Sequence, residues 1–316
     1  MTLHRFPSES LCVVGNINRD VKLSPVPPGK HLFEDGETSV GEIWETIGGG
    51  GANSACMAAS LGARVAFLGK AGQDELGNRL EQALERHGVT TRLARDGNGR
   101  TGTSVALAFD TGHRHFLSSL PNNASLSWAD LQSADFSGFA HLLRADIWFS
   151  ESMLFEGNRL LFSRARDAGL DVSIDLNWDP QWGVASAERI AARKEAVRDL
   201  LPMVTLAHGN VRELNQFADS SDLMTTLQRL TGWGAKAVVV HMGREGAGYF
   251  CEGKLLQQPP EMAQRQVNLT GTGDLLSVCM MLLRQQDGIS IQDQLRIANG
   301  IVRDFVEGKF CAIAGL

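Results

Sequence analysis

The feature that most constrains the fold is a regular alternation of short apolar runs with longer amphipathic segments. After residue 140 the strand-like runs are ADIWFS, LDVSIDLN, MVTLAH and KAVVVHMG, and helix-like segments such as GNRLLFSRARDAG and ERIAARKEAVRDLLP separate them. Parallel strands need crossovers of this length, and helices then cover both faces of the sheet. The sequence therefore predicts an α/β fold, doubly wound around a mainly parallel sheet.

Two segments interrupt this alternation. Residues 16–47 are rich in Pro, Gly and acidic residues and alternate in places, as in ETSVGEIWETI. Residues 100–120 alternate as TSVALAFD and HRHFLSSL, a pattern typical of a hairpin. We predict that both segments form a small β-sheet, appended as a lid to a single domain of residues 1–316.

The composition excludes several classes of protein. Hydrophobic residues make up 43% of the chain and charged residues 21%, as in a soluble globular protein, and the net charge is −6 without a basic cluster. Nucleic acid and anionic membranes are therefore not expected as partners. The five cysteines are scattered without a CxxC pair, and no apolar run approaches 18 residues. We expect a reduced, cytoplasmic protein.

One glycine-rich stretch lies directly before an apolar helix. Gly271-Thr272-Gly273 precede Asp274, and LLSVCMMLL follows. Successive amides at a helix start can hold an anion, and Asp274 could accept a proton from an alcohol placed above them. Phosphoryl transfer needs these two components and a cation. The alternative is a structural one, because an Asp in the first turn stabilises any helix.

A second glycine-rich stretch, Gly48–Asn53, also opens a helix. Four glycines allow a ligand to approach the backbone, and the amide of Asn53 offers a donor and an acceptor. A tight crossing of helix and strand is the alternative explanation. Asp20 follows the first predicted strand, at the edge of a parallel sheet where ligands bind, although a turn would also explain it.

Further motifs leave alternatives open. Asn210 and Glu213 form an N-x-x-E pair that fits either a helix cap or a contact to magnesium through water. The turn after the first strand lacks the G-x-G-x-x-G fingerprint of dinucleotide-binding enzymes. A near-match to a phosphate-binding loop at 248–254 has Leu255 where Ser or Thr must bind magnesium.

Taken in order, these motifs resemble the ribokinase (PfkB) family of carbohydrate kinases. GGGGAN followed by LGARVAFLGKAGQDELG is similar to the first signature of the family, and TGTGD at 270–274 is similar to the second. The resemblance implies a doubly wound core with a β lid that often serves in dimer formation. It also implies a kinase that uses ATP and Mg²⁺, and here a homodimer formed through the lid.

The resemblance also implies roles for individual residues. Asp274 would deprotonate the acceptor hydroxyl, and the amides of Gly271, Thr272 and Gly273 would hold the transferring phosphate. The residues that would bind the acceptor are Asp20, Gly49, Gly50, Asn53 and Glu151. The residues on the nucleotide side are Asn210, Glu213, Gly243, Gly246 and Asn299. Among these, Glu213 would contact magnesium indirectly, through water.

The sequence departs from the family pattern at several positions. Asn268 and Leu269 occupy the place where an Asp commonly helps to bind a monovalent cation, so we expect weak dependence on potassium. Gly50 stands where ribokinases often have Lys, which argues against ribose. Asp179 replaces the Arg of the D-x-N-x-R motif found in kinases of keto-deoxy acids, and His241 replaces a frequent Thr.

These observations together predict an ATP-dependent kinase that phosphorylates a primary hydroxyl of a small sugar or sugar acid. A nucleoside kinase of the same fold is one alternative, and a catalytically inactive sugar- or nucleotide-binding protein is another. The intact Asp274 and its glycines argue against the inactive protein. The side chains of the lid would select the acceptor.

Overall fold

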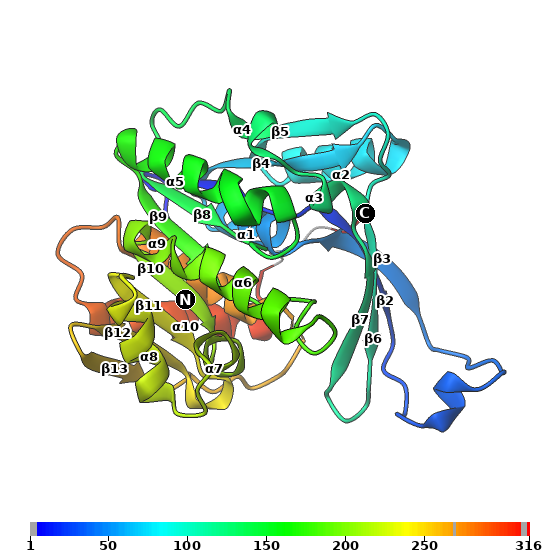
Figure 1. Ribbon diagram of the computed structural model, residues 1–316. Helices are drawn as coiled ribbons and strands as arrows, with labels where there is room; N and C mark the ends of the chain where they lie inside the picture. Colours follow the sequence, from blue (N-terminus) through cyan, green and yellow to red (C-terminus); the bar gives the residue numbers. More distant parts are fainter. Residues whose placement is uncertain (1–4, 268–269, 311–314) are drawn as a thin grey trace.

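The computed structural model describes residues 5–267, 270–310 and 315–316, and a nine-stranded sheet forms its centre (Figure 1). The strand order is β13-β12-β11-β10-β9-β8-β1-β4-β5. Every neighbouring pair from β11 to β5 is parallel, whereas β12 and β13 are antiparallel. The strands are β1 (Ser10–Val14), β4 (Arg64–Gly72), β5 (Val89–Asp96), β8 (His141–Arg144), β9 (Asp171–Asp175), β10 (Leu206–Asn210), β11 (Ala237–His241), β12 (Ala247–Cys251) and β13 (Lys254–Gln258). The predicted doubly wound, mainly parallel sheet is confirmed.

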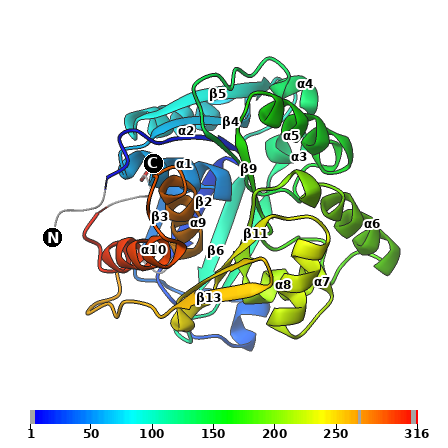
Figure 2. The same ribbon diagram turned by 90° about the vertical axis from the view of Figure 1, so that its left-hand side faces the viewer.

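Helices cover both faces of this sheet (Figure 2). The helices on one face are α1 (Gly50–Ser60), α2 (Glu75–Arg86), α9 (Thr272–Leu283) and α10 (Ile291–Val306). Those on the other face are α4 (Trp128–Leu131), α5 (Asn158–Asp167), α6 (Ala187–Arg198), α7 (Val211–Ala218) and α8 (Leu223–Gly232), and α3 (Pro121–Ala124) follows the small sheet. No helix in the described part of the chain is long and apolar enough to cross a bilayer.

Local sequence explains where the helices begin and which face they bury. In α2 the side chains of Leu80 and Leu84 are fully buried, four residues apart on one face, as their helical spacing predicts. The Asp74 carboxylate caps this helix by accepting a hydrogen bond from the Gly77 amide at 2.8 Å. The α9 helix is buried around almost its whole circumference, because it packs against both the sheet and α1.

The two interrupting segments form a separate four-stranded sheet beside the core (Figure 1). Its order is β3-β2-β6-β7, with β2 and β6 parallel and the outer pairs antiparallel. The strands are β2 (Asn18–Leu23), β3 (Ile43–Gly48), β6 (Thr103–Ala108) and β7 (Arg114–Ser119). The predicted small sheet is therefore present, and its role as a lid stays a prediction.

The chain order reverses at the centre of the large sheet, between β1 and β8. In open parallel sheets such a reversal leaves a crevice at the carboxyl ends of the strands, where ligands bind. The segment ADIWFS, predicted as a strand, forms a turn past this edge instead. The strand β8 ends at Arg144, and Asp146 adopts a left-handed backbone with φ of 54°.

Candidate active site

Asp274 lies in the first turn of α9, directly behind the predicted anion-binding amides. Gly271 precedes the helix with a φ of 85°, a left-handed conformation that suits glycine. Burial, followed by the charges of Asp146 and Glu213, raises the pKa of Asp274 to about 7. A carboxyl group whose pKa lies near neutrality is suited to accept a proton from an alcohol and release it again.

His241, at the end of β11, lies against this helix start. Its Nε2 is 2.9 Å from the Ser277 hydroxyl of α9, and a Cβ added to Gly273 would lie 2.8 Å from its Nδ1. Gly273 is therefore needed for the close approach of the imidazole. Burial lowers the pKa of His241 to about 4, so the ring is neutral at neutral pH. His241, which replaces a frequent Thr of the family, thus packs directly against the predicted anion-binding loop.

Carboxylates from several strand ends converge on the same place. Burial raises the pKa of Asp175 well above its ordinary value, and the negative charges of Asp274, Glu213 and Asp146 raise it further. These four groups follow or lie near the carboxyl ends of β8, β9, β10 and β11, which meet at one edge of the sheet. Their mutual repulsion makes the edge a favourable location for a cation.

Asp20 lies on β2 and forms the opposite wall. Its Oδ1 accepts a hydrogen bond from Asn18 Nδ2 at 2.8 Å, and burial raises its pKa to about 6. Gly48 is the cross-strand neighbour of Asn18, and a Cβ at this glycine would overlap the Asp20 carboxylate. The first glycine of the run therefore makes room for a carboxylate of the chain itself.

Asp146 is a site residue that the sequence analysis did not identify. Its carboxylate accepts hydrogen bonds from the amides of Asn16 at 2.9 Å, Gly50 at 3.2 Å and Gly51 at 2.8 Å, and from Asn177 Nδ2 at 3.2 Å. It therefore occupies the N-terminus of α1, where the helix dipole favours an anion. Burial still raises its pKa. No local pattern marks it, because the strand before it, β8, contains His141 and Arg144.

Gly49 and Gly51 serve the crossing of α1 over β1. A Cβ at Gly51 would lie 2.7 Å from the Cα of Gly15, and one at Gly49 would overlap the Asn16 carbonyl. Gly49 also has a φ of 94°. The glycine run is therefore explained by close contacts within the chain, and a role of Gly49 and Gly50 in acceptor binding stays a prediction.

Asn210 and Glu213 form a capping box at the start of α7. The Glu213 amide donates to Asn210 Oδ1 at 2.9 Å, and the Asn210 amide donates to Glu213 Oε2 at 2.9 Å. Burial raises the pKa of Glu213. The capping explanation of this motif is thus present in the structure, and the predicted contact to magnesium remains open.

Glu151 takes part in ion pairs rather than standing free in the site. Its carboxylate pairs with Arg193 and, at 2.9 Å, with Arg189. Arg193 is buried and also binds Asp179 at 2.8 Å. Asp179, which replaces the Arg of the D-x-N-x-R motif, therefore forms an ion pair with an arginine of α6. Acceptor binding by Glu151 stays a prediction.

The other predicted residues are distributed around this edge. Asn53, in the first turn of α1, has a buried Oδ1 without a hydrogen-bond partner. Gly243 and Gly246 bound the turn between β11 and β12, both with positive φ. Asn299 of α10 donates to the carbonyls of Gln258 at 3.1 Å and Pro259 at 2.9 Å, so it fixes the segment that follows β13.

Comparison with known proteins decides the family. The model of the pfkB family carbohydrate kinases matches residues 8–300. The chain belongs to this family. It is a sugar kinase, a phosphotransferase with an alcohol group as acceptor. The resemblance inferred from the two glycine-rich signatures is thereby confirmed.

Relatives and solved structures of similar sequence or fold agree with this assignment. A probable fructokinase-5 of Arabidopsis thaliana is 24% identical over 269 residues, which cover 84% of this chain and 81% of the relative. A putative ribokinase II from E. coli in complex with ATP and Mg²⁺ has a TM-score of 0.75 at 18% identity, covering 95% of this chain and 93% of that chain. The adenosine kinase of Sinorhizobium meliloti has a TM-score of 0.77 at 18% identity, covering 95% and 93%. Both structures share the fold of this pfkB family kinase.

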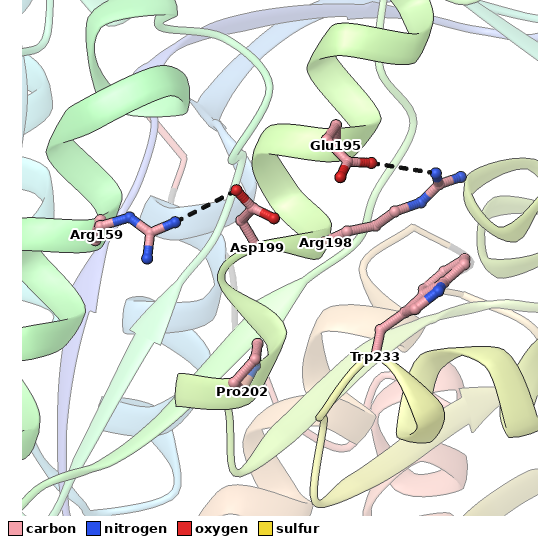
Figure 3. Close-up of a pocket in the computed structure, with 6 residues that line it drawn as sticks. All are labelled: Arg159, Glu195, Arg198, Asp199, Pro202 and Trp233. Atoms are coloured by element: carbon pink, nitrogen blue, oxygen red, sulfur yellow. Dashed lines mark hydrogen bonds and ion pairs between the residues drawn. The ribbon is translucent and has the colours of Figure 1, made fainter.

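Figure 3 shows a surface pocket of this kinase that none of the convergent carboxylates lines. It has a volume of about 480 Å³, and none of the predicted site residues lines it. Its residues are Arg159, Glu195, Arg198, Asp199, Pro202 and Trp233. Arg159 pairs with Asp199, and Arg198 pairs with Glu195 while covering the Trp233 ring at 4.5 Å. The charged side chains that line the pocket therefore form ion pairs with one another.

The prediction about potassium concerns residues for which no structural statement is made. Asn268 and Leu269 lie outside the described residues, as does much of the C-terminal GKFCAIAGL segment. Weak dependence on a monovalent cation therefore stays a prediction from the sequence.

Proposed function

We propose that this kinase transfers the γ-phosphoryl group of ATP to a primary hydroxyl of a small sugar or sugar acid. The observation that carries the proposal is the position of Asp274. It lies in the first turn of α9, next to the amides of Gly271–Gly273, with a pKa raised to about 7. A base adjacent to an anion-binding helix start is the arrangement that phosphoryl transfer to an alcohol requires.

In this mechanism Asp274 accepts the proton of the acceptor hydroxyl as the oxygen attacks the phosphorus. The amides of Gly271, Thr272 and Gly273 face the charge that develops on the transferring phosphate, because they lie at the positive end of the α9 dipole. The neutral ring of His241 packs against Gly273 and fixes the width of the loop. The acceptor hydroxyls are bound from the other side by Asp20 and by Asn53, whose Oδ1 lacks a partner.

The convergent carboxylates fit a magnesium ion bound together with the nucleotide. The charges of Asp146 and Glu213 raise the pKa of both Asp274 and Asp175, so a divalent cation near these carboxylates offsets their repulsion. In the described part of the chain, no three His, Cys, Asp or Glu side chains form a metal site by themselves. That agrees with a metal that keeps several waters and binds mainly phosphate oxygens. Glu213 would contact it through water, and the ion would neutralise charge on the phosphates.

The nucleotide would lie beside the turn at Gly243 and Gly246, with Asn299 fixing the adjoining segment. The E. coli protein of the same fold is in complex with ATP and Mg²⁺, which supports ATP as the nucleotide of this kinase. A nucleoside acceptor is the second candidate, favoured by the likeness to an adenosine kinase. The sugar is preferred because the family model describes carbohydrate kinases.

A homodimer formed through the small sheet is also part of the proposal. The face of this sheet turned away from Asp20 carries Val21, Val105 and Leu117 side by side, and Ile43 beside Leu23. Leu117 is 55% exposed and Ile43 63%. Because large apolar side chains clustered on a surface commonly mark an interface, a second copy of the chain would cover this face. We place the enzyme in the cytoplasm, where ATP is abundant.

An ADP-release assay with Mg²⁺–ATP and a panel of pentoses, hexoses, sugar acids and nucleosides tests the proposal. We expect release with a sugar or sugar acid and none with a nucleoside. Asp274→Asn should lower kcat by at least about 10³-fold, since the base is lost, while calorimetry still detects acceptor binding.

Asp293→Asn is the matched control for that substitution. Asp293 occupies the same third position of α10 that Asp274 occupies in α9, so both substitutions remove one charge from a first helical turn. The control should retain full activity. Near-normal turnover of Asp274→Asn would refute the assignment of the base, and activity only with nucleosides would establish the second candidate.

A further inference from the structure

Two cationic side chains lie on the same face of the small sheet as Asp20. Side chains two residues apart on a strand share a face, so Lys22 follows Asp20 on β2. Lys22 has Trp44 of β3 and Ala106 of β6 as its cross-strand neighbours, and Ala106 in turn pairs with Phe116 of β7. Arg114 lies two residues before Phe116 and therefore on this face as well.

This face is the one turned toward the candidate active site. The Asp20 carboxylate lies against Gly48, at the point where β3 leads into α1, and the charge of Asp146 acts on Asp20. Asn18 Nδ2 contacts Asp20 at 2.8 Å and the Ser104 hydroxyl at 3.5 Å, which places Ser104 on the same face. The cations therefore extend the wall that the acceptor would contact.

Neither cation is neutralised by a carboxylate at contact distance. Among the residues that the structure describes, the ion pairs within 4 Å include neither Lys22 nor Arg114. Burial lowers the pKa of both groups, and the charge of Arg114 lowers that of Lys22 further, while Asp20 opposes this shift. Lys22 is half-buried and Arg114 is exposed, and two cations that repel each other provide a favourable location for an anion.

The neighbours of Lys22 on this face are one small residue and two aromatic residues. Ala106 lies directly beside Lys22, and these two residues separate Trp44 from Phe116. Both aromatic rings remain accessible, with exposed fractions of 39% and 46%. The small Ala106 therefore sets Lys22 apart from Phe116, and a ligand that reaches this face would meet a cation flanked by accessible aromatic side chains.

We propose that the acceptor of this kinase carries an acidic group, a carboxylate or a phosphate ester, which binds between Lys22 and Arg114. The proposal rests on the kinase function proposed above and specifies its substrate class. Along β2, Asn18 lies next to the core and Lys22 lies farther out, with Asp20 between them. The acidic group would therefore be at the end of the acceptor remote from the hydroxyl next to Asp274.

Matched acceptors that differ only in charge test the proposal. D-Fructose has a CH₂OH group at C1, 2-keto-D-gluconate has a carboxylate there, and D-fructose 1-phosphate has a phosphate ester. Ribitol and D-ribonate, both open-chain, form a second set. We expect kcat/KM for an acid to exceed that of its neutral counterpart at least about tenfold, the usual gain for hydrogen bonds to a charged group. The two acids of the first set distinguish carboxylate from phosphate recognition.

Substitution of the cations tests their role directly. Lys22→Met and Arg114→Gln should each raise KM for the preferred acid about tenfold, while KM for ATP and for the neutral acceptor stays unchanged. Lys254→Met is the control, because it removes an exposed lysine side chain at the start of β13, an edge strand of the large sheet outside the small sheet. Raising the salt concentration should increase KM for the acid only.

The outcomes separate this proposal from the proposed function. Acids that are turned over no better than their neutral counterparts, or variants that weaken both classes equally, would overturn the proposal while kinase activity stands. If no acceptor supports ADP release, the proposed kinase function fails. Calorimetric titration of the same acceptors then tests whether the protein still recognises an acidic group. If 2-keto-D-gluconate and D-fructose 1-phosphate bind no more tightly than D-fructose, the proposal of an acid-binding site is overturned as well.

Discussion

At the scale of single residues, we expect the protonation of Asp274, the proposed base, to determine the rate. A base acts only when ionised, and its pKa is raised from 3.8 to about 7. The group is therefore largely protonated below pH 7, and kcat/KM for the acceptor should fall about tenfold per pH unit below that value. A pH profile measured at saturating Mg²⁺–ATP tests this. A rate that stays constant down to pH 5 would contradict it.

The neighbours of Asp274 allow a sharper version of the same experiment. The negative charge of Glu213 contributes to the raised pKa, so Glu213→Gln should move the acidic limb of the profile to lower pH. Glutamine keeps the capping box with Asn210, so the start of α7 is preserved. An unchanged limb would show that another group controls the profile.

The sequence was sufficient to find residues whose type and position are locally unusual. Asp274 stood out because a carboxylate precedes an apolar helix, and Asp20 because it follows the first strand. Asp146, Lys22 and Arg114 could not be identified in this way. Their significance depends on cross-strand register and on hydrogen bonds to residues more than 90 positions away, which no local pattern encodes.

At the scale of secondary-structure elements, the crossing of α1 over β1 tests the explanation given for the glycine run. Gly51→Ala would place a Cβ 2.7 Å from the Gly15 backbone, which cannot move aside as a side chain can. We expect a loss of about 1–3 kcal/mol in the free energy of unfolding, as for other overpacked sites. Urea denaturation measures this change.

Gly232→Ala is the matched control in another helix. Its Cβ would meet no atom within 4 Å, so the stability should be unchanged or increase by up to about 1 kcal/mol. If Gly51→Ala is as stable as Gly232→Ala, the glycine run serves ligand approach rather than packing.

Helices were easier to predict than the exact limits of strands. The segment GNRLLFSRARDAG, predicted as helical, contains α5 (Asn158–Asp167). The strand β8 was placed too late because it contains buried His141 and Arg144, whose polarity disguises it. Asn158 accepts a hydrogen bond from Arg144 at 2.8 Å, so tertiary structure compensates a charge that looks unfavourable in sequence.

At the scale of the whole molecule, the exposed apolar side chains on the face of the small sheet turned away from Asp20 lead us to expect a homodimer. Leu117→Glu would place a charge in the proposed interface, and we expect it to convert a dimer into a monomer in sedimentation velocity experiments. Val184→Glu is the control, because Val184 is 77% exposed at a position outside the small sheet. A wild-type protein that sediments as a monomer at micromolar concentration would exclude the dimer.

The hydrogen bonds at the base of the small sheet have a consequence for engineering and for divergence. Asp146 holds the amides of Asn16 and Gly50, just outside β2 and β3, and Asn122 accepts from the Gly102 amide at 2.8 Å, just before β6. The polypeptide thus leaves and re-enters the core at fixed points. We expect that the two segments of the small sheet, residues 18–48 and 103–119, could be replaced together by those of a relative. Such a chimaera would acquire a new acceptor while inheriting the phosphoryl-transfer apparatus unaltered.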